Sequence, residues 1–208
     1  MIAFQFRRKL SLLLSLAGAF CFHPALAANP EIRSGVDEGM MLHIAKDPRS
    51  QLVTGYFMST RLQGQFSCIF YFKGKATGPS FEIETYFPET PNEVIRGKLT
   101  VVKPGLFKIS LVEDHGGCWN VMVFANKNEP VEFSVGFAHP RWTAIKVLKA
   151  EKAHFFESPE SKAPKKGYLV VGDPVGVTEA RGEWLKVDYL TASKKLVSGW
   201  MKQADFFP

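Results

Sequence analysis

Short apolar segments follow one another from residue 52 to residue 137, separated by Gly, Pro or Asn. In one of them Phe107, Ile109 and Leu111 alternate with polar residues, which is the period of two of a strand with one buried face. No segment keeps a helical period over about 11 residues. The pattern therefore predicts strands at 52–59, 65–74, 80–87, 94–103, 107–113, 119–124 and 131–137.

Strands this short and this closely spaced predict an all-β chain. Its first domain, residues 51–142, is predicted to be an antiparallel β-sandwich or a barrel. The preceding stretch, 28–50, has one apolar patch, 40–44, and is interrupted by Pro and Gly. It is predicted to be a loose lead-in.

The first 27 residues have the three parts of a secretory signal peptide: a basic start (Arg7, Arg8, Lys9), an apolar run, and an Ala-x-Ala site ending at Ala27. The apolar run is too short to span a bilayer comfortably. Phe20 precedes Cys21, where a lipoprotein signal needs a small residue. We therefore predict export to the periplasm or beyond, with cleavage near Ala27.

Cleavage there removes three basic residues and no acid, which leaves 23 basic and 20 acidic residues and a net charge of +3. This is an ordinary surface balance, and no segment combines clustered Lys or Arg with stacking aromatics, so nucleic acid is not a predicted partner. No later apolar stretch reaches the ~20 residues of a transmembrane helix.

Two cysteines remain after cleavage, Cys68 and Cys118. In an oxidising compartment such a pair normally forms a disulfide, which is the prediction here. The alternative is a free Cys118 thiol activated by His115 across Gly116 and Gly117, which would indicate a hydrolase.

The C-terminal stretch begins a different pattern after Trp142, with a polar loop at 158–167 between short apolar segments. Four pieces, Ala153-His-Phe-Phe156 with Ser158-Pro159, 168–173, 182–189 and 199–205, occur in the order found in bacterial SH3 domains. Residues 147–208 therefore resemble that family. The resemblance implies a small SH3-like barrel after the first domain.

The same resemblance implies a groove that binds peptide or cell-wall stems, with the 158–167 loop as one wall. The aromatic residues that could line it are Phe155, Tyr168, Trp184, Tyr189 and Trp200. Each of them could instead belong to the core, because aromatic side chains at strand positions are often buried.

The residue pattern gives little support for metal binding, for glycoside hydrolysis or for phosphate binding by a Gly-rich loop. The histidines of the mature chain, His43, His115, His139 and His154, show no spacing that would place two metal ligands on one element. No pair of carboxylates has a setting typical of glycosidases, and no Gly-rich loop leads into a helix. The sequence thus predicts no cofactor, no metal and no enzyme.

Two segments are candidates for contact with a protein partner. The first is the turn formed by His115, Gly116, Gly117 and Trp119, beside the predicted disulfide, and the second is Arg141 with Trp142. The second could instead be a linker packed between two domains.

The prediction is therefore an exported, non-enzymatic binding protein of the bacterial cell envelope, with an envelope protein or a cell-wall peptide as partner. The most specific version of this prediction is an inhibitor of a cell-wall hydrolase or an immunity protein. The alternatives are an accessory protein of a peptidoglycan hydrolase, a Cys118-centred hydrolase, and a structural envelope protein.

Overall fold

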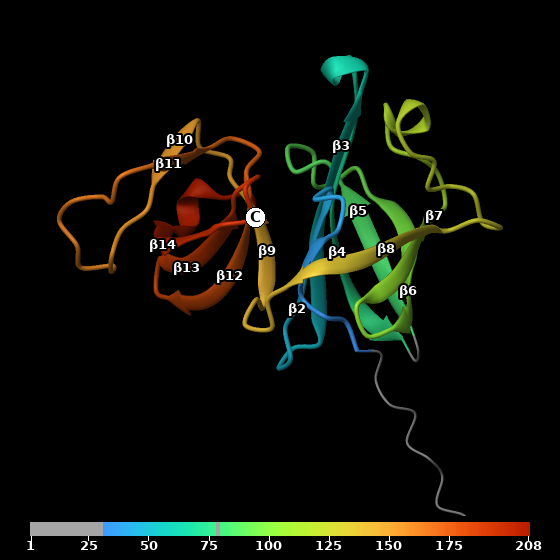
Figure 1. Ribbon diagram of the computed structural model, residues 1–208. Coiled ribbons are helices and arrows are strands. Elements are labelled where there is room, and N and C mark those ends of the chain that lie inside the picture. Colours follow the sequence, from blue (N-terminus) through green and yellow to red (C-terminus); the bar gives the residue numbers. More distant parts are fainter. Residues whose placement is uncertain (1–30, 78–79) are drawn as a thin grey trace, which may run out of the picture.

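The structure is a computed structural model that describes residues 31–77 and 80–208. The predicted signal peptide lies outside the described residues. The described chain is nearly all β, as the alternating pattern predicts, and its first part forms a closed antiparallel barrel (Figure 1). The two forms left open by the sequence, sandwich or barrel, are thereby resolved in favour of the barrel.

Eight strands make up this barrel in sequence order, each antiparallel to the next. They are β1 (Gly35–Asp37), β2 (Leu42–Lys46), β3 (Leu52–Arg61), β4 (Phe66–Thr77), β5 (Ser80–Tyr86), β6 (Ile95–Lys103), β7 (Leu106–Leu111) and β8 (Val131–Ala138). Closure comes from β8 pairing back onto β1, with Gly35 opposite Ala138. Closing the sheet leaves no exposed edge along this part of the chain.

Two features of the barrel differ from the sequence prediction. Residues 28–50 are not only a lead-in, because β1 and β2 within them supply two of the eight strands. Both strands are too short to produce a recognisable alternation. Residues 119–124 do not form a strand: a short 3-10 helix, η2 (Cys118–Asn120), and irregular chain replace it.

Aromatic side chains fill the barrel. Phe57, Phe70 and Phe124 are fully buried and meet with ring centroids 5.0–5.2 Å apart. An eight-stranded barrel has room for little more than its own inward side chains unless these are small. Here they are large, so the interior is a packed core.

The C-terminal unit, residues 144–206, forms a four-stranded sheet in the order β14-β13-β12-β9 and a two-stranded sheet, β10-β11. Its elements are β9 (Ala144–Val147), β10 (Lys152–His154), β11 (Tyr168–Val170), β12 (Pro174–Arg181), β13 (Trp184–Leu190), β14 (Leu196–Lys202) and a short 3-10 helix, η3 (Gln203–Asp205). Buried aliphatic residues such as Val175, Val187 and Met201 form its own core.

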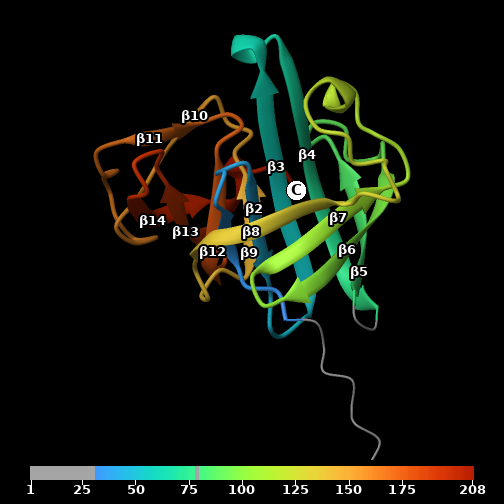
Figure 2. The same ribbon diagram turned by 45° about the vertical axis from the view of Figure 1, so that its right-hand side comes forward.

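Strand β9 lies against the outside of the barrel (Figures 1 and 2). The Tyr71 hydroxyl on β4 donates to the Ile145 carbonyl at 3.0 Å, and the Ile145 N–H donates to the Thr54 hydroxyl at 2.8 Å. Buried apolar residues from both parts surround these bonds. The barrel and the C-terminal unit therefore share an interface of buried apolar side chains and hydrogen bonds.

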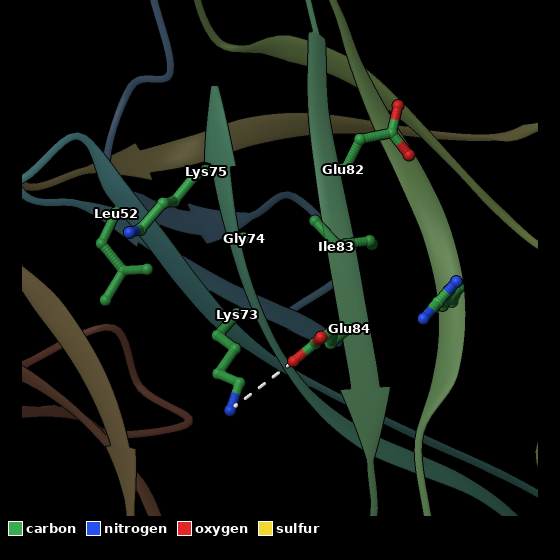
Figure 3. Close-up of a pocket in the computed structure, with 8 residues that line it drawn as sticks. Leu52, Lys73, Gly74, Lys75, Glu82, Ile83 and Glu84 are labelled. Atoms are coloured by element: carbon green, nitrogen blue, oxygen red, sulfur yellow. Dashed lines mark ion pairs between the residues drawn. The ribbon is translucent and has the colours of Figure 1, made fainter. Parts of the chain in front are cut away.

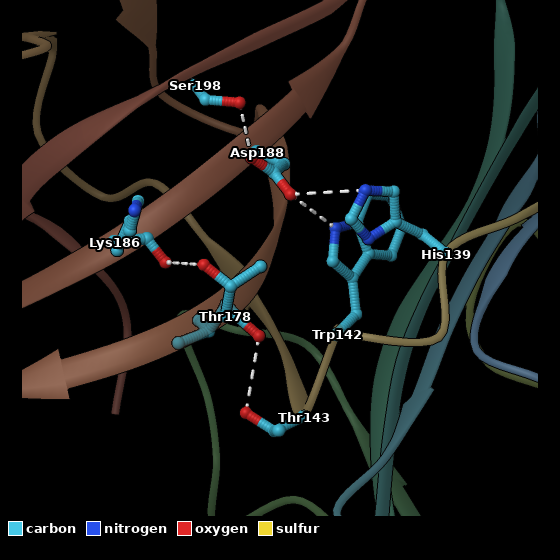
Figure 4. A network of polar contacts seen from close by, with 8 residues as sticks. His139, Trp142, Thr143, Thr178, Lys186, Asp188 and Ser198 are labelled. Atoms are coloured by element: carbon cyan, nitrogen blue, oxygen red, sulfur yellow. Dashed lines mark hydrogen bonds and ion pairs between the residues drawn. The ribbon is translucent and has the colours of Figure 1, made fainter.

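Asp188 on β13 is the polar centre of this junction (Figure 4). Its carboxylate accepts hydrogen bonds from Trp142 Nε1, at 3.0 Å, and from the Ser198 hydroxyl, and His139 Nε2 lies 3.5 Å from it. The Trp142 indole lies over Gly176 of β12, where any side chain would collide with the ring. Trp142 is fully buried in this junction, which corrects its assignment as a partner-binding residue, whereas Arg141 is exposed.

His43 on β2 makes folding stability depend on pH. Only 8% of it is exposed, and desolvation lowers the pKa of its imidazole from 6.5 to about 4. Between those values the unfolded chain binds a proton that the folded chain does not, so stability falls as pH decreases through this window. We expect unfolding by urea to show a loss of about 2–3 kcal/mol between pH 7 and pH 4.5 from this residue.

The variant His43→Gln is expected to lose less stability over the same pH range, because glutamine does not titrate. His154→Gln, on the C-terminal unit, is the matched control and is expected to keep the wild-type pH dependence. An identical slope in His43→Gln and wild type would contradict the assignment.

Candidate functional site

The predicted disulfide is present between Cys68 on β4 and Cys118, the first residue of η2. Both residues are fully buried and their Cα atoms are 4.3 Å apart. The bond ties the loop after β7 to the barrel wall. It also removes the free Cys118 thiol on which the hydrolase alternative depended.

His115 does not lie on the surface as predicted. Its ring is buried, stacks on Phe70 with centroids 5.3 Å apart, and places Nε2 2.7 Å from the Thr85 hydroxyl. Burial lowers its pKa, although the neighbouring Asp114 charge acts in the opposite direction. The imidazole therefore closes one end of the barrel core, and it reaches the surface only as part of a cleft wall.

Asp114 and Gly117 hold the rest of the loop. The Asp114 carboxylate accepts the backbone N–H groups of Phe124, at 2.6 Å, and Ala125, at 3.1 Å. Gly117 has a φ of +85°, and a side chain there would collide with the Ser67 carbonyl. Backbone turn bonds from the N–H groups of residues 120–122 to the carbonyls of Gly117 and Cys118, together with the Asp114 bonds, satisfy this chain without a strand.

Trp119 remains exposed on this pre-ordered loop. Its exposed fraction is 69%, and the two other exposed apolar residues of residues 112–125, Val112 and Val123, have 61% and 48%. We call residues 112–125 the Trp119 segment. Figures 1 and 2 show it at the same end of the barrel as the tip of the β3–β4 hairpin, where Leu62 is also exposed. Of the predicted turn residues, Trp119 and Gly116 thus stay accessible.

A cleft of about 300 Å³ adjoins the turn. It is lined by Phe87, Val94 and Ile95, by two carboxylates, Glu93 and Glu113, and by His115 and Gly116. The Trp119 segment therefore contributes Glu113, His115 and Gly116 to a small hollow that carries negative charge. The sequence offers no signal for this pairing, since residues 93 and 113 are on different loops.

The aromatic set of the C-terminal unit is not gathered in one groove. Phe155 and Trp200 are buried, which corrects their assignment as ligand-binding residues. Tyr168 is exposed, with Lys152 Nζ 3.9 Å from its ring centroid. Half-buried Trp184 contacts Phe156 edge-on with ring centroids 5.2 Å apart, and Tyr189 donates to Asp173 at 3.4 Å.

A further hollow of about 540 Å³ lies along β4, β5 and β6 (Figure 3). Lys73 and Glu84 point toward each other across it, 3.7 Å apart, and both are about half exposed. Its other charged residues are Lys75, Glu82 and Arg96, so both signs are mixed. Ion pairs of this kind are typical of a solvated sheet face.

In the described part of the chain, no three His, Cys, Asp or Glu side chains gather as metal ligands. Nor does that part contain a helix long and apolar enough to cross a membrane. Comparisons with protein-family models, curated proteins and solved structures yield no match to this chain. Its function must therefore be inferred from its own residues.

Proposed function

We propose that this chain is an exported, non-enzymatic binding protein of the bacterial cell envelope, and that its barrel presents the Trp119 segment to a protein partner. The observation that carries the proposal is a tryptophan exposed by 69% on a loop held by a disulfide, by the Asp114 carboxylate and by the buried His115 ring. Tryptophan is enriched among the residues that dominate binding energy at interfaces.

Pre-ordering explains why this loop suits binding. A flexible loop loses conformational entropy when it docks, whereas a loop already fixed at both ends loses little. The disulfide lies directly before Trp119, and the Asp114 bonds hold the chain five residues beyond it, at Phe124. The indole is therefore presented by a rigid support.

The adjoining cleft indicates the chemistry of the partner. An apolar pocket on the partner would accept Trp119, and a Lys or Arg beside that pocket would meet Glu93 and Glu113. An inhibitor of a cell-wall hydrolase or an immunity protein is the most specific form of this proposal, since both act by binding another protein.

For the C-terminal unit we propose an SH3-like fold. Supporting features are the strand order of the four-stranded sheet, the short 3-10 helix η3, and the bridge between Leu148 and Phe206 that follows it. Of the predicted groove residues, half-buried Trp184, in contact with Phe156, is the one on which we base a proposal of cell-wall peptide binding. An accessory protein of a peptidoglycan hydrolase is the corresponding second candidate.

Substituting Trp119 should weaken partner binding without unfolding the protein. We expect Trp119→Ala to raise the Kd for the envelope partner about 30-fold, because truncating a central aromatic at an interface costs about 2 kcal/mol. The partner is first identified by photo-crosslinking from a benzoylphenylalanine at position 119, and the Kd is then measured by calorimetry with both purified proteins.

Lys127→Ala, at an exposed position just beyond the segment, is the control and is expected to leave the Kd unchanged. Equal affinities of Trp119→Ala and wild type would overturn the proposal. Crosslinking to peptidoglycan fragments and to no protein would favour the second candidate.

A further inference from the structure

A second cleft, independent of the Trp119 segment, lies at the junction of the barrel and the C-terminal unit. Its volume is about 430 Å³. Its walls are Met40, His43 and Met58 from the barrel side, and Val171, Gly172, Asp173, Pro174, Tyr189, Leu190 and Ala192 from the C-terminal unit. Small-molecule sites have this size, and they often form between domains from apolar walls with a few polar groups.

His43 is a polar wall residue of this cleft. It is more than nine-tenths buried, and its Nδ1 atom has no hydrogen-bond partner among the described residues. Desolvation lowers its pKa to about 4, so the ring is neutral near pH 7. Buried polar groups are normally paired, so the unpaired His43 Nδ1 marks this junction as locally unfavourable.

Asp173 gives the cleft its charge. One carboxylate oxygen accepts the Val170 N–H at 2.8 Å and the other accepts the Tyr189 hydroxyl at 3.4 Å. Within residues 31–77 and 80–208 no Lys, Arg or His forms an ion pair with it, and none of the wall residues is Lys or Arg. Burial and the Asp173 charge together raise the pKa of Tyr189. The cleft thus contains a negative charge that no described cation neutralises.

Met40 and Met58 supply a polarisable apolar wall opposite this carboxylate. Met40 has a φ of +61°, a conformation that a side chain bearing a Cβ seldom adopts. A turn built on Asp37 holds it there, since the Asp37 carboxylate accepts the N–H groups of Gly39 and Met41 at 2.8 and 2.7 Å. Unfavourable backbone conformations of this kind concentrate at functional sites.

We propose that the junction cleft binds a small organic ammonium ion with an apolar stem. The Asp173 carboxylate and the Tyr189 ring attract the cation, by ion pairing and by cation–π interaction respectively. Methionine side chains pack against flexible aliphatic stems of varied shape. The neutral His43 adds no positive charge that would repel such a ligand.

The test uses the purified mature protein with 13C-methyl methionine and NMR titration at pH 7. The probes are n-hexylammonium, 1-hexanol and hexanoate, which share a stem and differ in charge. We expect n-hexylammonium to shift the Met40 and Met58 methyl signals with a Kd of about 1 mM, as its size allows. Hexanoate is expected to shift neither signal, and the Met122 and Met201 signals serve as internal references.

Asp173→Asn keeps an acceptor for the Val170 N–H and removes the charge. It is expected to weaken n-hexylammonium binding about fivefold and to leave 1-hexanol binding unchanged. Asp205→Asn, an acid on the same unit outside the cleft wall, is the matched control. Met58→Lys, at a half-exposed position, places a tethered ammonium at the cleft and is expected to abolish the shift of the Met40 signal.

Three results would overturn the proposal. They are equal binding of n-hexylammonium and 1-hexanol to the wild type, an unchanged Kd in a folded Asp173→Asn protein, and methyl shifts at Met122 and Met201 of the same size as those at Met40 and Met58.

Discussion

Replacing both Cys68 and Cys118 by alanine is expected to lower the free energy of unfolding by about 4 kcal/mol, the loop-closure entropy that a 50-residue separation implies. The loss is large for this fold because domains are stable by only about 5–15 kcal/mol. Two buried side chains also shrink, which adds a small cavity cost. Urea unfolding of the purified mature protein, followed by tryptophan fluorescence, measures the change.

Trp119→Ala is the control for this measurement. It alters an exposed side chain next to the bond and is expected to change the free energy of unfolding by less than about 0.5 kcal/mol. Reduction of the wild type under mild denaturant is expected to reproduce the effect of the double variant. A loss below about 1 kcal/mol in the double variant would show that the native contacts of the loop hold without the bond.

The second large effect is expected at the junction of the barrel and the C-terminal unit. Asp188→Ala removes the acceptor of the buried Trp142 N–H and of the Ser198 hydroxyl. We expect a destabilisation of about 1–3 kcal/mol, because the buried Trp142 donor is left without a partner, whereas the exposed Ser198 hydroxyl can bond to water. The same unfolding experiment measures it, and hydrogen exchange at Ile145 reports on the interface itself.

Asp188→Asn separates the role of the acceptor from that of the charge. Its amide oxygen can still accept the Trp142 N–H, so we expect a loss of about 1 kcal/mol. Similar stability of Asp188→Ala and wild type would mean that the Trp142 ring packing alone holds the junction.

The two predictions concern contacts that the sequence reveals to different extents. The Cys68 and Cys118 bond could be predicted because only two cysteines follow the predicted signal peptide, and export to an oxidising compartment was itself a prediction from the sequence. The Asp188 network could not, because His139, Trp142 and Ser198 carry no spacing relation to Asp188. Such contacts depend on how one sheet packs on another.

The candidate site likewise has one part that the sequence predicts and one part that only the structure reveals. The turn with Gly117 and Trp119 is evident from composition, and Trp119 is exposed as expected. The burial of His115 is not evident, because local sequence cannot show that Phe70 and Thr85 surround the ring. A histidine followed by glycine can occur in an exposed turn, or the histidine can pack at the end of a hydrophobic core.

Alternation of apolar and polar residues was sufficient to indicate an all-β chain and most barrel strands, because a period of two is imposed locally by the strand backbone. Closure of the barrel depended on β1 and β2, whose few residues gain their pairing energy only from distant neighbours such as Ala138. The segment 119–124 has strand-like composition, yet it does not form a strand. Instead, the Asp114 carboxylate accepts the Phe124 N–H and the disulfide holds Cys118 against the barrel. Contacts between residues far apart in sequence therefore decided the barrel, its junction and both candidate sites.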